Sequence, residues 1–203
     1  MNLLRAAATI SGLTLVSRIL GLVRETLVAS VYGAGALTDA FFVAFRLPNM
    51  LRRLFAEGAF TQAFVPVLAQ SQQHSPEETR RVLDAVATML FWVLTAVVAV
   101  GVLAAPWLVW MVASGLRQDP QTFSIAVLMT RWMFPYILLI SLVALAAAVL
   151  NLWKRFAVPA FAPVLLNISI ILAALFLSPY FDPPVLALAA GVMIGGVLQL
   201  LWQ

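Results

Sequence analysis

The sequence is dominated by long stretches that contain no charged residue. One of them fills the whole interval between Asp84 and Arg117. Three more cover residues 132–153, 156–181 and 183–203. A helix needs about 20 apolar residues to cross the hydrocarbon core of a bilayer, so each stretch is long enough for one crossing. Because 64% of the residues are apolar and only 10% are charged, the chain as a whole also has the composition of an integral membrane protein.

We predict an all-α, polytopic membrane fold with six transmembrane helices. Two less regular apolar segments precede the uncharged stretches and hold most of the charges within the apolar regions. The six expected helices cover residues of about 8–33, 36–68, 82–113, 122–152, 157–178 and 184–203. The second contains Pro48 and Pro66, so it should bend or extend past the membrane. Ser75 followed by Pro76 and two glutamates predicts the start of a helix.

The Lys and Arg residues of the connections predict the orientation. If the helices alternate in direction, the basic residues gather on one side of the membrane: Arg5, Arg80, Arg81, Lys154 and Arg155. Basic loops stay in the cytoplasm, so the N-terminus is expected there. The net charge of +4 comes with no Lys/Arg-rich polar domain, which argues against nucleic-acid binding.

The first apolar segment carries a polar stripe. Its members recur at steps of three and four, so they share one helix face: Ser11, Thr14, Arg18, Gly21 and Glu25. Arg24 lies about a third of a turn away from this stripe. An arginine near the centre of a membrane helix costs about 2.5–3.5 kcal/mol, so these charges require a compensating reason.

The second segment repeats this arrangement. Its polar face holds Asp39, Arg46, Asn49, Arg53 and Glu57, with Arg52 beside it. If the first helix ends near residue 32 and the second begins near residue 37, the rise of a helix places Arg18 level with Arg52, and Arg24 level with Arg46.

Two interpretations of these charges remain. The arginines could pair with Glu25 or Asp39 inside the membrane, or extend to the interface, as Arg52 and Arg53 could. Alternatively, they line a hydrated cavity that receives an anion. Arginine suits phosphate because its planar fork binds two oxygens and stays protonated. The arginines outnumber the nearby carboxylates, which favours the anion.

The segment from Ser17 to Leu68, which begins SRILGLVRETLVAS, closely resembles the opening of the MurJ (MviN) family of lipid II flippases. The stretches FPYILLISLVAL, NLWKRFAVPAFAPVLLNISII and PPVLALAAGVMIGGVLQL agree with the same family. Its members belong to the MOP superfamily, whose MATE-like fold has two six-helix lobes around a central cavity. The resemblance covers the N-terminal lobe, residues 1–203, and the second lobe is absent from this chain.

The resemblance implies specific roles. The family's substrate-binding cavity arginines correspond to Arg18, Arg24 and Arg52. Its acid on the outer side corresponds to Asp39. A further position that is acidic in the family corresponds to Glu25. Arg46, Arg53, Glu57 and Asn49 are secondary candidates from the spacing alone. The implied activity is the transfer of lipid II, by alternating access, across the bacterial cytoplasmic membrane during peptidoglycan synthesis. The implied partners are lipid II, membrane lipids, the C-terminal lobe and cell-wall synthesis or division proteins.

Rival functions stay open. The chain could serve a flippase for another polyprenyl-linked saccharide, or act as a non-transporting membrane scaffold. A multidrug exporter is disfavoured, because cationic substrates would prefer buried acids to arginines. We expect no enzymatic activity, no metal and no cofactor, although a dependence on membrane potential or a coupled ion is left open.

Overall fold

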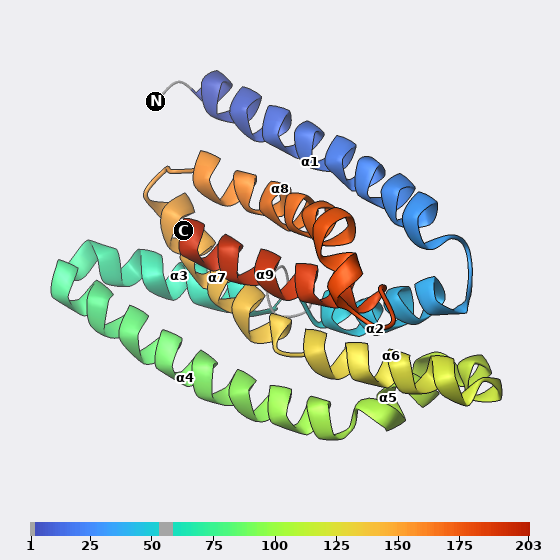
Figure 1. The fold of residues 1–203 in the computed structure, drawn as a ribbon. Coiled ribbons are helices and arrows are strands. Elements are labelled where there is room, and N and C mark those ends of the chain that lie inside the picture. The colour runs from blue at the N-terminus through green and yellow to red at the C-terminus, as the bar shows by residue number, and fades with distance from the viewer. Residues whose placement is uncertain (1–2, 53–58) are drawn as a thin grey trace.

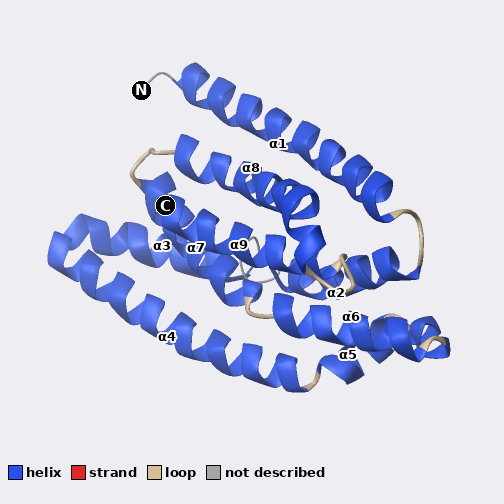
Figure 2. Ribbon diagram, in the orientation of Figure 1, coloured by secondary structure: helices blue, strands red, loops and turns tan. Residues whose placement is uncertain are grey.

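The computed structural model describes residues 3–52 and 59–203, and within these ranges the regular structure is entirely helical (Figure 2). The α-helices are α1 (Leu3–Tyr32), α2 (Ala36–Arg52), α3 (Ala59–His74), α4 (Pro76–Leu103), α5 (Ala105–Val112), α6 (Pro120–Met133), α7 (Tyr136–Leu152), α8 (Ala157–Leu172) and α9 (Leu186–Trp202). A π-helical turn, Ala173–Leu177, extends α8. The prediction of an all-α fold is confirmed.

Four helical stretches in the described part of the chain are long and apolar enough to cross a membrane. They are Ala7–Tyr32, Pro76–Leu103, Pro120–Leu152 and Ala157–Tyr180. A fifth apolar helix, Leu186–Trp202, is shorter. The segment expected at 36–68 takes the form of α2 and α3, whose ends lie on either side of residues 53–58, and α3 continues past the expected end to His74. These two helices are on average less hydrophobic than the helices of the four long stretches.

Prolines mark the breaks within the long apolar runs. Pro106 follows the break between α4 and α5, and Pro135 lies at the break between α6 and α7. Proline has no N–H to donate, so Pro106 leaves the carbonyl of Val102, four residues earlier, without its helical partner. Arg131 of α6 donates from Nε to that carbonyl at 3.3 Å. An arginine therefore supplies the hydrogen bond that the proline removes.

The first two helices, α1 and α2, pack against different parts of the molecule. In Figure 1 α1 lies along α8, at the opposite edge of the molecule from α4. The contacts agree, since α1 packs chiefly on α8, α2 chiefly on α6, and α3 on α4. The largest buried cluster includes Phe41 of α2, Met129 of α6, Tyr136 of α7 and Leu188 of α9, and so joins both ends of the sequence.

Small residues bring α8 and α9 close together. A Cβ added at Gly191 would lie 2.7 Å from the Ala173 Cβ, and one added at Gly195 would lie 3.2 Å from the Leu166 Cα. Ser169 donates its hydroxyl hydrogen to the Gly191 carbonyl at 2.7 Å. The GxxxG pattern of α9 thus serves helix packing, where small residues let two backbones approach.

Local signals in the sequence set two helix ends. The Ser75 Oγ accepts a hydrogen bond from the Glu78 N–H at 3.1 Å, which confirms the predicted start of α4. Gly33 follows α1 with φ of 74°, a conformation that suits glycine because it has no Cβ. Gly33 therefore ends α1 and lets the chain turn into α2.

Candidate functional site

A cleft of about 530 Å³ lies between α1 and α2. It is lined by Arg24, Glu25, Asp39, Phe41, Phe42, Val43, Phe45, Arg46 and Asn49. The helices leave this space because each packs mainly on a different partner, α1 on α8 and α2 on α6. Four of the charged residues singled out from the sequence therefore meet around one space: Arg24 and Glu25 from α1, and Asp39 and Arg46 from α2.

Arg24 is held on two sides. Its Nη1 donates to Asn167 Oδ1 on α8 at 3.0 Å, and its Nη2 donates to Glu25 Oε1 at 3.1 Å. Its side chain is 20% exposed, whereas that of Glu25 is 59% exposed. The guanidinium thus has a fixed anchor on its buried side and an accessible carboxylate partner on the other.

The α2 side of the cleft combines charge with an aromatic wall. Asp39 and Arg46 are exposed, and Asn49 is half-buried. Phe41 and Phe45 stack with ring centroids 5.8 Å apart and an interplanar angle of 6°. The apolar wall suits a ligand that carries a hydrocarbon portion beside its charge.

Charges in the described lining balance, with two arginines against two carboxylates. The predicted excess of arginine therefore does not come from this set of residues. Arg24 is paired with Glu25, as the ion-pair interpretation expected, while Asp39 makes no ion pair with Arg24 among the described residues. Closure of an Asp39–Arg24 pair stays a prediction.

The remaining candidates lie elsewhere or outside the described side chains. Arg18 is exposed on α1 and is not in the described lining; six residues separate it from Arg24, about 9 Å along the helix axis. Arg52 ends α2, but its side chain is not described. Arg53 and Glu57 lie outside the described residues. The structure brings Arg24 and Arg46 to one cleft, and a shared site of Arg18, Arg24 and Arg52 stays a prediction.

Asn167 was not predicted from the sequence. It is 7% exposed, and its Nδ2 donates to the Ser17 carbonyl at 3.0 Å as well as to the Ser17 Oγ at 3.4 Å. A lone amide within the apolar run 156–181 is the only signal that could have marked it, because polar side chains inside membrane helices usually find a partner on a neighbouring helix.

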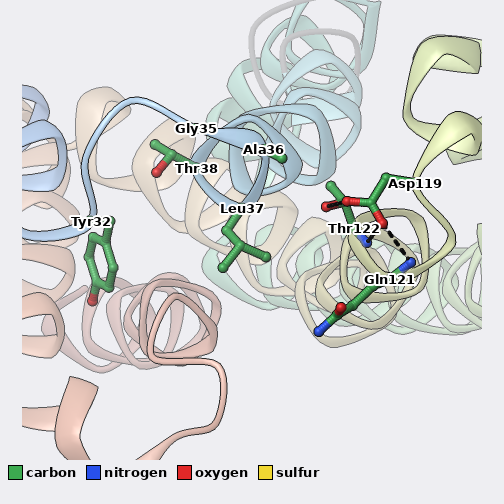
Figure 3. Close-up of a pocket in the computed structure, with 8 residues that line it drawn as sticks. All are labelled: Tyr32, Gly35, Ala36, Leu37, Thr38, Asp119, Gln121 and Thr122. Carbon is green, nitrogen blue, oxygen red and sulfur yellow. Dashed lines mark hydrogen bonds between the residues drawn. The ribbon is translucent and has the colours of Figure 1, made fainter.

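A second hollow, of about 390 Å³, lies at the turn between α1 and α2. Figure 3 shows the start of α2 with Tyr32 on one side and, on the other, Asp119 just before α6 and Gln121 and Thr122 within it. The Tyr32 hydroxyl shares a hydrogen bond with the Ser178 hydroxyl. Asp119 accepts from the Gln121 N–H at 3.0 Å and from the Thr122 hydroxyl, so it caps α6. Its carboxylate is engaged in starting a helix, which makes the α1–α2 cleft the better candidate site.

The Asp119 cap makes the start of α6 sensitive to acid. Hydrogen bonds from the Thr122 hydroxyl, and from the Thr122 and Gln121 N–H groups, hold the pKa of Asp119 below its ordinary value of 3.8. A lowered carboxyl pKa stabilises the folded state above the ordinary value, and this contribution is lost as the pH falls through the lowered pKa. We expect the protection factor of amides in the first turn of α6, which is the exchange rate relative to that of an unfolded chain at the same pH, to be unchanged between pH 7 and 5 and to fall below about pH 4. Asp119→Asn, which caps without titrating, should remove that acid dependence; its persistence in the variant would contradict this assignment.

Comparisons with known proteins agree on one family. A family model described as "Lipid II flippase MurJ" matches residues 28–203. The chain is 56% identical, over its whole length, to "Lipid II flippase MurJ" of Burkholderia cenocepacia, and 43% identical to "Probable lipid II flippase MurJ" of Vibrio cholerae. A solved structure titled "Lipid II flippase MurJ, inward closed conformation" superposes with a TM-score of 0.81 at 30% identity, over 95% of this chain. The chain spans about 40% of the length of each of these proteins.

Proposed function

Because this chain belongs to the lipid II flippase MurJ family, we propose that it forms the N-terminal lobe of a flippase that moves a lipid-linked peptidoglycan precursor to the outer leaflet. The four long apolar stretches support a multi-pass location, which we assign to the bacterial cytoplasmic membrane with the N-terminus inside. The curated relatives are named as flippases, which are transporters, and transport of a lipid requires no covalent step.

The placement of Arg24 and Arg46 around one cleft is the observation that carries this proposal. Lipid II joins a polyprenyl chain to a sugar–peptide headgroup through a pyrophosphate. Guanidinium groups bind phosphate oxygens through paired, charge-assisted hydrogen bonds. In the proposed complex Arg24 and Arg46 hold the pyrophosphate, with Arg18 and Arg52 adding positive charge along α1 and α2. Phe42, which lines the cleft and is 46% exposed, faces the first apolar units of the chain.

The balanced charge of the cleft lining fits an exchange of partners. Glu25 is the exposed partner of Arg24. An incoming pyrophosphate can therefore replace the Glu25 carboxylate on Arg24, and the released carboxylate remains exposed. After the headgroup leaves, the carboxylates rebalance the arginines, which lowers the cost of unpaired charge within the membrane. Asp39 then pairs with Arg24 to close the outer side while the cavity faces the cytoplasm.

Membrane potential gives the cycle a direction. With the inside negative, moving one unit of negative charge outward is favoured by about 2.3 kcal/mol per 100 mV. Because the described lining is charge-balanced, the same potential draws the site back toward the cytoplasm only through the positive charge that Arg18 and Arg52 add. Rocking of two lobes around a fixed site is the form that alternating access takes in many transporters built from repeated bundles.

A chimaera tests the proposal. This chain replaces the matching 40% of the Burkholderia cenocepacia relative, in a bacterium depleted of its own flippase. We expect the chimaera to restore lipid II on the outer surface, as measured by an externally added enzyme that cleaves the exposed headgroup. The same cells receive the remaining part of the relative alone as a control.

Two results would contradict the proposal. Abundant, inserted chimaera that exposes no lipid II, yet moves another polyprenyl-linked saccharide, would identify a flippase for a different headgroup. Inserted chimaera that moves neither lipid, in cells where the relative itself works, would point to a scaffold.

A further inference from the structure

Asn167 contacts both α1 and the arginine that faces the cleft. It lies on α8, is 7% exposed, and accepts a hydrogen bond from Arg24 Nη1 at 3.0 Å through its Oδ1. Its Nδ2 donates to the Ser17 carbonyl at 3.0 Å. One amide therefore joins a charged side chain to the backbone of the same helix, two turns away.

The spacing on α1 explains why one residue can reach both partners. Ser17, Gly21 and Arg24 follow one another at steps of four and three, so they lie on one face of α1. A Cβ added at Gly21 would lie 4.0 Å from the Asn167 Nδ2, which places the amide over the bare backbone between Ser17 and Arg24. This is an ordinary van der Waals distance, so the amide lies directly against this face of α1.

Both ends of the Asn167 amide are used, so its orientation is fixed. The oxygen accepts from a cation and the nitrogen donates to a backbone carbonyl, and reversing the amide would place donor against donor at Arg24. A buried, fixed acceptor restricts the rotamers of a long side chain. Arg24 has five N–H donors, more than the two bonds to Asn167 and Glu25 take up, so the anchored guanidinium keeps donors for a ligand.

We propose that Asn167 is a positioning residue that holds the Arg24 guanidinium in the orientation that binds the anionic headgroup. The inference rests on the proposed function, since it assigns Asn167 a role through Arg24. Glu25, which is exposed, is exchanged for the ligand, whereas Asn167, which is buried, stays bound to Arg24 throughout. α8 thus contributes to a site that is lined by α1 and α2.

Asn167→Ala in the chimaera tests the inference. We expect it to lower the rate of lipid II exposure about tenfold, because Arg24 loses a hydrogen bond to a charged group and with it a fixed orientation. Asn167→Leu fills a similar space and should show the same loss, so a cavity cannot account for both. Ser169→Ala is the matched control, because Ser169 is equally buried on α8 but bonds to Gly191 of α9 instead of α1. It should leave the rate within about twofold.

A double-mutant cycle separates positioning from a merely structural role. If Asn167 acts through Arg24, its replacement should cause no further loss of rate in an Arg24→Ala background. An equal loss in both backgrounds, or a wild-type rate for Asn167→Ala and Asn167→Leu, would overturn the inference. If Arg24→Ala itself keeps the wild-type rate, the proposed anion role of the cleft fails. A low rate for Arg24→Ala with a normal rate for both Asn167 variants overturns the positioning role alone.

Discussion

Arg24→Ala is expected to lower lipid II exposure by the chimaera by roughly 10- to 100-fold at equal expression. Hydrogen bonds to charged groups contribute about 1.5–3 kcal/mol, and each 1.4 kcal/mol corresponds to a factor of ten. The truncation also leaves the buried Asn167 Oδ1 without its donor and releases Glu25, so the cleft changes from balanced to net negative. A net negative cleft repels an anionic headgroup, which adds to the loss.

Two variants separate charge from geometry at this position. Arg24→Lys keeps the positive charge but loses the planar fork, so we expect an intermediate rate. Arg117→Ala removes an arginine from the exposed turn Ser114–Gln118, far along the chain from the cleft helices, and should behave as wild type. A wild-type rate for Arg24→Ala would remove the cleft arginine from the transport mechanism.

Gly101→Val is expected to prevent the normal packing of α4 against the α6–α7 junction. A Cβ built on Gly101 would lie 1.8 Å from Phe134 Cε1 and 2.3 Å from its Cζ. Phe134 is 3% exposed and lies beside Pro135, so its ring has little freedom to move. Overpacking a core costs about 1–3 kcal/mol per substitution, and valine adds three carbons at a site with no space for one.

The measurement is thermal unfolding of the purified chain in detergent, followed by helical circular dichroism. Gly12→Ala is the matched control, because a Cβ at Gly12 meets no atom within 4 Å and alanine favours a helix over glycine by about 1 kcal/mol. Gly12→Ala should raise the melting temperature slightly, whereas Gly101→Val should lower it by several degrees or more. Adding Phe134→Ala to Gly101→Val should restore part of the loss, and additive losses would contradict a direct clash.

The sequence predicts the helices well because their cause is local. Each uncharged run has enough apolar residues to form a membrane helix, and Ser75 caps α4 with its own side chain. The rise of a helix was enough to place Arg24 level with Arg46, and both line one cleft. Prolines were a weaker guide, because Pro48 and Pro66 lie inside α2 and α3, whereas Pro106 and Pro135 lie beside breaks between helices.

The unpredicted features depend on contacts between distant parts of the chain. Asn167 lies 143 residues from Arg24, and no local pattern shows that α8 packs beside α1. The same is true of Arg131, whose partner is the Val102 carbonyl of another helix. The balanced charge of the cleft was also not predicted. Helix periodicity shows which residues share a face, but it does not show which residues of that face line a cleft.

Photocrosslinking of lipid II to the α1–α2 cleft tests the central claim most directly. A photoreactive phenylalanine analogue replaces Phe42, which lines the cleft and is 46% exposed, or Trp92, which is 66% exposed on α4. In membranes that contain the chimaera, we predict that lipid II crosslinks at position 42, that Arg24→Ala removes this crosslink, and that position 92 shows none above the level of bulk lipid. Equal crosslinking at both positions, or a crosslink at position 42 that survives Arg24→Ala, would contradict binding of the headgroup by the cleft arginines.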